Sequence, residues 1–265
     1  MTTIRSSMEI MSILLLISLS IPLWLVNGFQ TTHPWTPVIR GTTSSARMFS
    51  ENGDTLTGDQ LRSITVTNTD GERVKLGDSM GDGVSVIVFL RHLGCGWCWS
   101  YARAWTQLKE EIEGMEDVTG PVFISIGDPD RLNVFLSKNT EIMPQQIFVD
   151  GYDFAAYKNA GFIRMDEQPE EIQTTIKGNP WDLGGMQEWW TFLTTFMGLA
   201  PYTEDMPMSE KFNPEGLLWS GGTFVVRGKE IVYRRDELVS GDNPDPREVL
   251  AIAKEAAAGS VQERR

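Results

Sequence analysis

A strand-like run that leads directly into two cysteines constrains the fold of this chain more than any other feature. Residues 84–90 are mostly apolar and β-branched, which is the composition of a buried strand. A short turn then leads to Cys95 and Cys98, after which apolar side chains recur at helical spacing at positions 99, 102, 105 and 108. The pattern predicts that a strand delivers a Cys-x-x-Cys pair to the first turn of a helix.

The start of a helix is a favourable place for a reactive thiol. Unpaired backbone N–H groups and the positive end of the helix dipole stabilise a thiolate there, and comparable motifs lower the pKa of the attacking thiol to about 7. We expect Cys95 to lie at the exposed end of the motif and to attack a disulfide or an O–O bond. Cys98, one helical turn deeper, would then resolve the intermediate as a redox-active disulfide, with no bound cofactor.

The residues around the cysteines allow both functional and ordinary interpretations. Arg91 could stabilise the thiolate, or it could pair with one of the many surface carboxylates. His92 could tune the thiol pKa or simply end the strand, and Trp97 could contact the substrate or cover the disulfide. The cysteines could also be a static disulfide or buried thiols, but a Cys-x-x-Cys pair between a strand and a helix is a fairly specific redox signal.

Composition and charge narrow the classes of function. The chain has two cysteines, both in the motif, and of its two histidines only His92 lies outside the N-terminal leader. One Cys-x-x-Cys pair supplies half of the ligands of a tetrahedral zinc site, so we expect no metal. The formal net charge is −13, and residues 49–265 carry 20 basic and 35 acidic side chains, a charge of −15. Such acidity argues against nucleic acid as a partner.

The first 50 residues have the composition of targeting segments. Residues 1–28 place Arg5 before a mostly apolar run, as in a signal peptide. Residues 29–50 begin with Phe29, are rich in Thr and Ser and contain no acidic residue, as in a transit peptide. This two-part order resembles the presequence of algae with secondary plastids, so we expect a plastid (chloroplast) location. Secretion or retention in the endoplasmic reticulum is the alternative, and an uncleaved membrane anchor comes third.

The remaining chain is an α/β series. The expected strands are residues 62–66, 73–76, 121–127, 146–150, 224–226 and 231–233. The expected helices are the motif helix to about 114, then residues 128–138, 152–161 and 247–258. We therefore expect one α/β domain at residues 55–258, with a central mixed sheet flanked by helices, followed by a flexible tail at 259–265.

Residues 166–220 interrupt this series as a Trp/Met-rich insertion before the last hairpin. Within it, apolar residues recur at helical spacing from Met186 to Leu199. This stripe could cover the sheet or the mouth of the active site. It could instead be a docking helix, and because its flanks lack Lys and Arg, a protein partner such as a plastid complex is favoured over lipid.

Four stretches carry a resemblance to a known family. They are VIVFLRHLGCGWC, PVFISIGDPDRLNVF, IFVDGYDFAAYKNAGF and GGTFVVRGKEIVYRR followed by GDNPDPREVL. In this order they resemble the thioredoxin fold in its peroxiredoxin-like (AhpC/TSA-type) form, and more narrowly the branch that includes prostamide/prostaglandin F synthase. The resemblance covers roughly residues 60–165 and 220–258, and it implies a thiol-dependent antioxidant oxidoreductase.

The chain departs from this family pattern at two places. Peroxiredoxins place a Thr three residues before the peroxide-reacting Cys, and here that position is His92. Thioredoxins place a cis-Pro before the strand that faces the cysteines, and here Gly222 and Thr223 stand there. A Gly-Gly-Thr loop still lets a substrate backbone or a small peroxide approach closely, so both are candidate substrate-binding residues.

Three hypotheses about function follow. The favoured one is a thiol–disulfide oxidoreductase or peroxiredoxin-like enzyme that receives electrons from a thioredoxin-type partner, because no Gly-x-Gly-x-x-Gly fingerprint follows a strand. A narrower version of it is reduction of a lipid endoperoxide. The alternative is a non-catalytic thioredoxin-like subunit or assembly factor of a plastid membrane complex, which would bind through residues 166–220.

Overall fold

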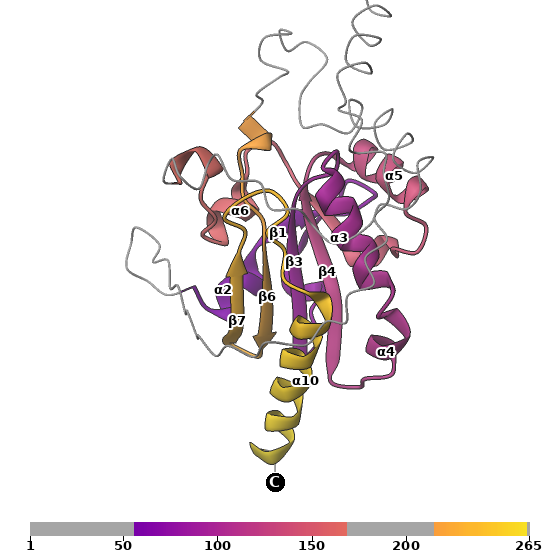
Figure 1. Cartoon of the computed structure of the whole chain (residues 1–265), viewed down its shortest axis with the longest axis vertical. Helices are drawn as coiled ribbons and strands as arrows, with labels where there is room; N and C mark the ends of the chain where they lie inside the picture. The colour runs from indigo at the N-terminus through magenta and orange to yellow at the C-terminus, as the bar shows by residue number, and fades with distance from the viewer. Residues whose placement is uncertain (1–55, 169–214, 264–265) are drawn as a thin grey trace, which may run out of the picture. The chain divides into compact units, whose positions relative to one another are not determined.

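The centre of the fold is a mixed sheet of seven strands. A computed structural model describes residues 56–168 and 215–263 (Figure 1). In these residues the strand order is β2-β1-β5-β4-β3-β6-β7. The strands are β1 Thr65–Thr67, β2 Arg73–Lys75, β3 Val84–His92, β4 Val118–Ile126, β5 Ile147–Asp150, β6 Gly222–Arg227 and β7 Glu230–Asp236.

Helices cover both faces of this sheet. The α-helices are α2 Gly58–Ser63, α3 Gly96–Thr106, α4 Lys109–Glu113, α5 Pro129–Lys138, α6 Ala155–Asn159 and α10 Pro246–Glu263. Short 3-10 turns lie at Leu76–Ser79, Pro144–Gln146, Met165–Glu167 and Glu215–Leu217. Helices α3, α4, α5 and α10 pack against one face of the sheet, while α2 and α6 pack against the other (Figure 1).

The strand directions confirm the predicted thioredoxin-like α/β class. β3 is parallel to β4, and β4 is parallel to β5. β6 is antiparallel to β3, and β1, β2 and β7 are also antiparallel to their neighbours. Since strands on both sides and helices on both faces enclose β3, all nine of its residues are buried, as its apolar run predicts.

Strand β3 divides the core into two layers. The side chains of Val86, Val88 and Leu90 belong to the layer beneath α3 and α10. Those of Ile87 and Phe89 belong to the layer beneath α6. Because successive side chains point to opposite faces, the strand that ends at the cysteine motif anchors both layers at once.

Several boundaries differ from the predictions. Thr57 and Gln60 form a capping box that starts α2, so a helix occupies part of the segment expected to be a strand. The motif helix breaks after Thr106 and continues as the separate α4. Helix α10 extends to Glu263, so residues 259–263 are not the predicted tail. A single glycine in a helix costs only about 1 kcal/mol, and the Ala-rich run before Gly259 favours continuation.

Most of the insertion and the whole leader lie outside the described residues. This applies to residues 1–28 and 29–50, and to the stripe from Met186 to Leu199. At the described edges of the insertion, Arg164 and Trp219 form an antiparallel bridge. Trp219 is buried and stacks on Phe154 with ring centroids 5.6 Å apart, so this tryptophan serves the core. Within residues 56–168 and 215–263, no helix combines the length and apolarity that crossing a membrane requires.

Candidate functional site

The two cysteines lie where the end of strand β3 connects to helix α3. Cys95 is the N-cap residue of α3, and Cys98 lies in its first turn. The backbone N–H of Cys95 donates to the His92 carbonyl at 3.0 Å, and its own carbonyl accepts the first helical hydrogen bond, from Trp99 at 3.1 Å. Both cysteines are free thiols. The predicted order of strand, Cys-x-x-Cys and helix is confirmed.

The predicted exposure of Cys95 is wrong. Its exposed fraction is 5%, and that of Cys98 is 2%. The physical reason is that two loops reach over the end of β3. The guanidinium of Arg91 donates to the Leu217 carbonyl, before β6, and to Ser240 Oγ, after β7. These contacts hold both loops against the end of β3, beside the cysteines.

Arg91 touches both sulfurs. Its Nη1 lies 3.9 Å from Cys95 Sγ, and its backbone N–H donates to Cys98 Sγ at 3.2 Å. Burial opposes the charge on Arg91, but the nearby Cys95, Cys98 and Glu237 outweigh burial and raise the pKa of Arg91. Arg91 is therefore a buried cation beside the thiols, and its partners are not the surface carboxylates that the sequence also allowed.

This environment separates the two thiols electrostatically. The hydrogen bond from Cys98 is the main influence that lowers the pKa of Cys95, and the Arg91 charge and two backbone N–H groups add to it. Burial opposes these effects, and the pKa of Cys95 still falls to about 6. Burial and the Cys95 thiolate raise the pKa of Cys98 well above its ordinary value. At neutral pH the pair therefore holds one thiolate and one thiol.

The other two predicted residues near the cysteines are His92 and Trp97. His92 is buried, and burial together with the Arg91 charge lowers its pKa well below the ordinary value, so the ring is neutral. A neutral imidazole adds no positive charge beside the thiolate. Trp97 is half-buried and packs against the apolar layer beneath α3.

Gly222 and Thr223 do not contact the cysteines by hydrogen bonds. Thr223 Oγ1 lies 3.2 Å from Tyr101 Oη, and both residues are buried on the α3 side of the sheet. A Cβ added at Gly222 would meet the Phe162 ring at 2.6 Å, which belongs to the opposite layer. The structure thus brings Arg91 and the two cysteines together. Gly222 and Thr223 lie in β6, the strand that pairs with β3, and are not part of this group.

Sequence reasoning missed one member of the site. Glu237 follows β7 directly and has an exposed fraction of 3%. Burial raises the pKa of Glu237 to about 8, Arg91 opposes that rise, and Cys95 and Asp242 add to it. The residue stands in the charged run RRDEL, which resembles an ordinary solvated strand end. A weak signal was the apolar pair that follows it, Leu238 and Val239.

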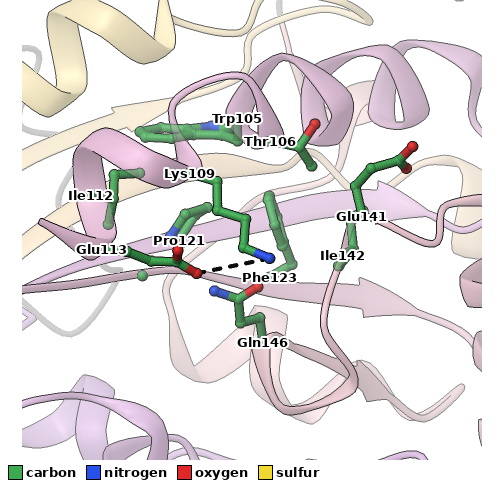
Figure 2. A pocket seen from close by; sticks show the side chains of 11 residues that line it. Trp105, Thr106, Lys109, Ile112, Glu113, Pro121, Phe123, Glu141, Ile142 and Gln146 are labelled. Atoms are coloured by element: carbon green, nitrogen blue, oxygen red, sulfur yellow. Dashed lines mark ion pairs between the residues drawn. The ribbon is translucent and has the colours of Figure 1, made fainter.

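A separate small cavity, of about 30 Å³, lies beneath α3 and α4 (Figure 2). Lys109 and Glu113 form an ion pair of 3.8 Å at its rim, and Phe123 and Ile142 line it (Figure 2). This volume holds about two waters, and neither cysteine lines it. Among the described residues, no group of three or more His, Cys, Asp or Glu side chains is placed to hold a metal ion.

Comparison with known proteins finds similar folds. No family model and no curated protein matches the chain. A peroxiredoxin-like protein from Aquifex aeolicus is 16% identical, covering 73% of this chain and 82% of its own, with a TM-score of 0.39. Peroxidoxin BcpB from Mycobacterium tuberculosis is 14% identical, covering 76% and 98%, with a TM-score of 0.47. The bacterioferritin comigratory protein of Xanthomonas campestris is 13% identical, covering 76% and 96%, with a TM-score of 0.46. At these identities the similarity concerns the fold alone.

Proposed function

We propose that this chain is a thiol-dependent oxidoreductase in which Cys95 attacks and Cys98 resolves. The observation that carries the proposal is that two adjacent thiols at the start of a helix have pKa values shifted in opposite directions. The pKa of Cys95 falls to about 6 while that of Cys98 rises. A thiolate is the nucleophile in thiol–disulfide exchange, and a neutral second thiol is held ready for the following step.

With a disulfide substrate, the Cys95 thiolate forms a mixed disulfide and expels one substrate thiolate. Cys98 then loses its proton and attacks Cys95 Sγ, which releases the second substrate thiol and leaves the Cys95–Cys98 disulfide. Two electrons have passed from the cysteine pair to the substrate. A thioredoxin-type dithiol would restore the reduced pair by the reverse exchange.

With a hydroperoxide substrate, the Cys95 thiolate attacks the distal oxygen and cleaves the O–O bond. The products are a Cys95 sulfenic acid and an alcohol, once one proton is taken up. Cys98 then attacks the sulfenic sulfur and releases water, which forms the same disulfide. His92 replaces the family's Thr and is neutral, so an oxygen would have to be oriented by the N–H groups at the start of α3 and by Arg91. A lipid endoperoxide, the substrate of the prostaglandin-related branch, would react by the same O–O cleavage.

Trapping with Cys98→Ser tests this proposal. A substrate that reacts at Cys95 should accumulate as a mixed disulfide that dithiothreitol releases, and Cys95→Ser should abolish the adduct. Turnover is then measured with a protein disulfide, a small hydroperoxide and a lipid endoperoxide. If the wild-type cysteines change thiol state with none of these oxidants, the redox proposal is wrong. The chain would then be a binding subunit, as in the alternative hypothesis.

We also propose that residues 1–50 direct the chain to a plastid. The support is the order of an apolar run, Phe29 and an acid-free hydroxylated segment. A fluorescent protein fused after residue 50 should enter the plastid of an alga with secondary plastids, and Phe29→Ala should hold it in the endoplasmic reticulum. Secretion of both fusions would contradict the proposal.

A further inference from the structure

Glu237 and Arg91 are held by the same two loops. The backbone N–H of Glu237 donates to the Gly221 carbonyl at 2.9 Å, and a Cβ added at Gly221 would lie 3.1 Å from Glu237 Oε1. Arg91 donates to the Leu217 carbonyl, four residues before Gly221, and to Ser240 Oγ, three residues after Glu237. The buried carboxyl and the buried guanidinium therefore lie within one enclosure at the end of β3.

The single positive charge of Arg91 in this enclosure favours a single negative charge beside it. Arg91 is the one buried Lys or Arg in the described part of the chain. Three acids interact with it, the Cys95 and Cys98 thiols and the Glu237 carboxyl. Burial and Cys95 raise the pKa of Cys98 well above its ordinary value, so Cys98 stays protonated and two acids remain. An isolated charge in such surroundings is costly, so a single buried cation favours a single ionised partner at a time. When two acids share one cation, their protons are exchanged as a coupled pair.

We propose that Glu237 holds a proton while Cys95 is a thiolate and releases that proton when Cys95 and Cys98 form a disulfide. Arg91 then faces one negative charge in both redox states, first on sulfur and afterwards on the carboxylate. Glu237 is thus a positioning residue that acts through Arg91. This inference rests on the proposed function, because it requires the cysteine pair to be oxidised and reduced.

The step balances in atoms and charge. The Cys95 thiolate, the Cys98 thiol and the Glu237 carboxylic acid lose two electrons and two protons. The S–S bond forms, the S–H bond of Cys98 and the O–H bond of Glu237 break, and Glu237 is left as a carboxylate. The electrons pass to a disulfide or a hydroperoxide, which takes up two protons as it is reduced to two thiols or to an alcohol and water.

The other charged and titratable groups around Glu237 leave this exchange intact. The Cys95 charge disfavours ionisation of Glu237 in the reduced state, and burial raises its pKa to about 8. Asp242 also disfavours it, but Asp242 is paired with Arg235 at 2.8 Å and takes no part in the exchange. Tyr101 and Tyr157 are buried phenols whose pKa burial raises, so they stay neutral. The groups that interact with Glu237 are Arg91, Cys95, Cys98, Tyr101, Tyr157 and Asp242.

The test is the pH dependence of the redox equilibrium against glutathione for the full chain, between about pH 6 and 8, where Cys95 is ionised and Glu237 is not. The wild type releases two protons per two electrons and glutathione disulfide takes up two, so both reduction potentials move by about 59 mV per pH unit and the equilibrium constant between them should not change with pH. Glu237→Gln releases only the Cys98 proton against the two that glutathione disulfide takes up, so its equilibrium constant should change about 10-fold per pH unit, or about 30 mV. Asp236 is the neighbouring carboxyl, which pairs with Arg234 at 2.8 Å, so Asp236→Asn is the matched control and should keep the pH-independent equilibrium constant of the wild type.

A second measurement on the wild-type chain does not depend on folding of the variant. Infrared difference spectra at neutral pH should show a protonated carboxyl band in the reduced state that disappears on oxidation. A 10-fold dependence in the wild type, or a carboxyl band equal in both states, would overturn the role of Glu237 and leave the redox function standing. Failure of the cysteines to form a reversible disulfide would instead overturn the proposed function itself.

Discussion

Arg91→Gln tests the electrostatic basis of the site. The substitution removes the buried positive charge and keeps a side chain that can donate hydrogen bonds to the surrounding loops. Arg91 Nη1 lies 3.9 Å from Cys95 Sγ. The charge stabilises the thiolate and not the neutral thiol, so we expect the variant to raise the pKa of Cys95.

The magnitude follows from this separation. Two unit charges about 4 Å apart interact by about 1 kcal/mol in water and about 4 kcal/mol at an effective dielectric constant of about 20. At about 1.4 kcal/mol per pKa unit, these limits correspond to a shift of about 1 to 3 units. The Cys98 hydrogen bond is the larger cause of the low pKa and remains in the variant, so we expect the lower part of this range, about 1 to 2 units. The thiolate share at pH 7 would fall from about 0.9 to between about 0.5 and 0.1.

The assay is the pH dependence of alkylation of Cys95 by iodoacetamide, with the adduct identified by mass spectrometry. Arg103→Gln is the matched control, because Arg103 lies on the same helix, contacts Asn139 Oδ1 at 3.0 Å and is about 12 Å along the axis from Cys95. The reasoning is refuted if Arg91→Gln moves the alkylation midpoint by less than about 0.5 unit, or if Arg103→Gln moves it equally.

Three further predictions concern single groups. Cys98→Ala should raise the pKa of Cys95 more than Cys98→Ser does, since only serine retains a donor, and an equal alkylation midpoint in both variants would contradict this. Tyr157→Phe should lower the free energy of unfolding by about 1–2 kcal/mol in urea titrations, because the hydroxyl donates to the buried Leu90 carbonyl; an unchanged midpoint would show that this bond contributes nothing. The pKa of Asp128 is lowered, because backbone and side-chain hydrogen bonds and the Arg131 charge outweigh burial. The ionised Asp128 therefore stabilises the fold above its ordinary pKa, and this stabilisation is lost as pH falls through the lower pKa of the folded chain. Asp128→Asn should flatten stability against pH in that acidic range, and an unaltered profile would contradict the assignment.

The sequence predicts those parts of the fold whose signals are local. The apolar run of β3 and the start of α5 at Asp128 each depend on neighbouring residues, and each appears as predicted. The start of α2 also had a local signal, the capping box of Thr57 and Gln60, which was overlooked. The extension of α10 past residue 258 likewise had a local signal, the Ala-rich run before Gly259.

The candidate site likewise has residues whose proximity follows from the local sequence and residues whose proximity does not. Cys95, Cys98 and Arg91 lie within eight consecutive positions, so their proximity follows from one turn of chain. Glu237 lies 139 positions after Cys98, and only the pairing of β6 with β3 and β7 brings it to the same place. Burial of Cys95 has the same origin, since the covering loops precede β6 and follow β7. Long-range pairing of this kind leaves no trace in hydrophobic periodicity.

A cysteine at the N-cap of α3 couples the oxidation state of this protein to its folding stability. Because the pKa of Cys95 is lower in the folded chain than in an unfolded one, ionisation of this residue adds to folding stability. That contribution is full above the ordinary thiol pKa and is lost as pH falls through about 6. Oxidation removes the same anion at any pH and leaves the first amides of α3 without it. The part of the folding stability that comes from the Cys95 thiolate is therefore present in the reduced chain and absent from the oxidised one.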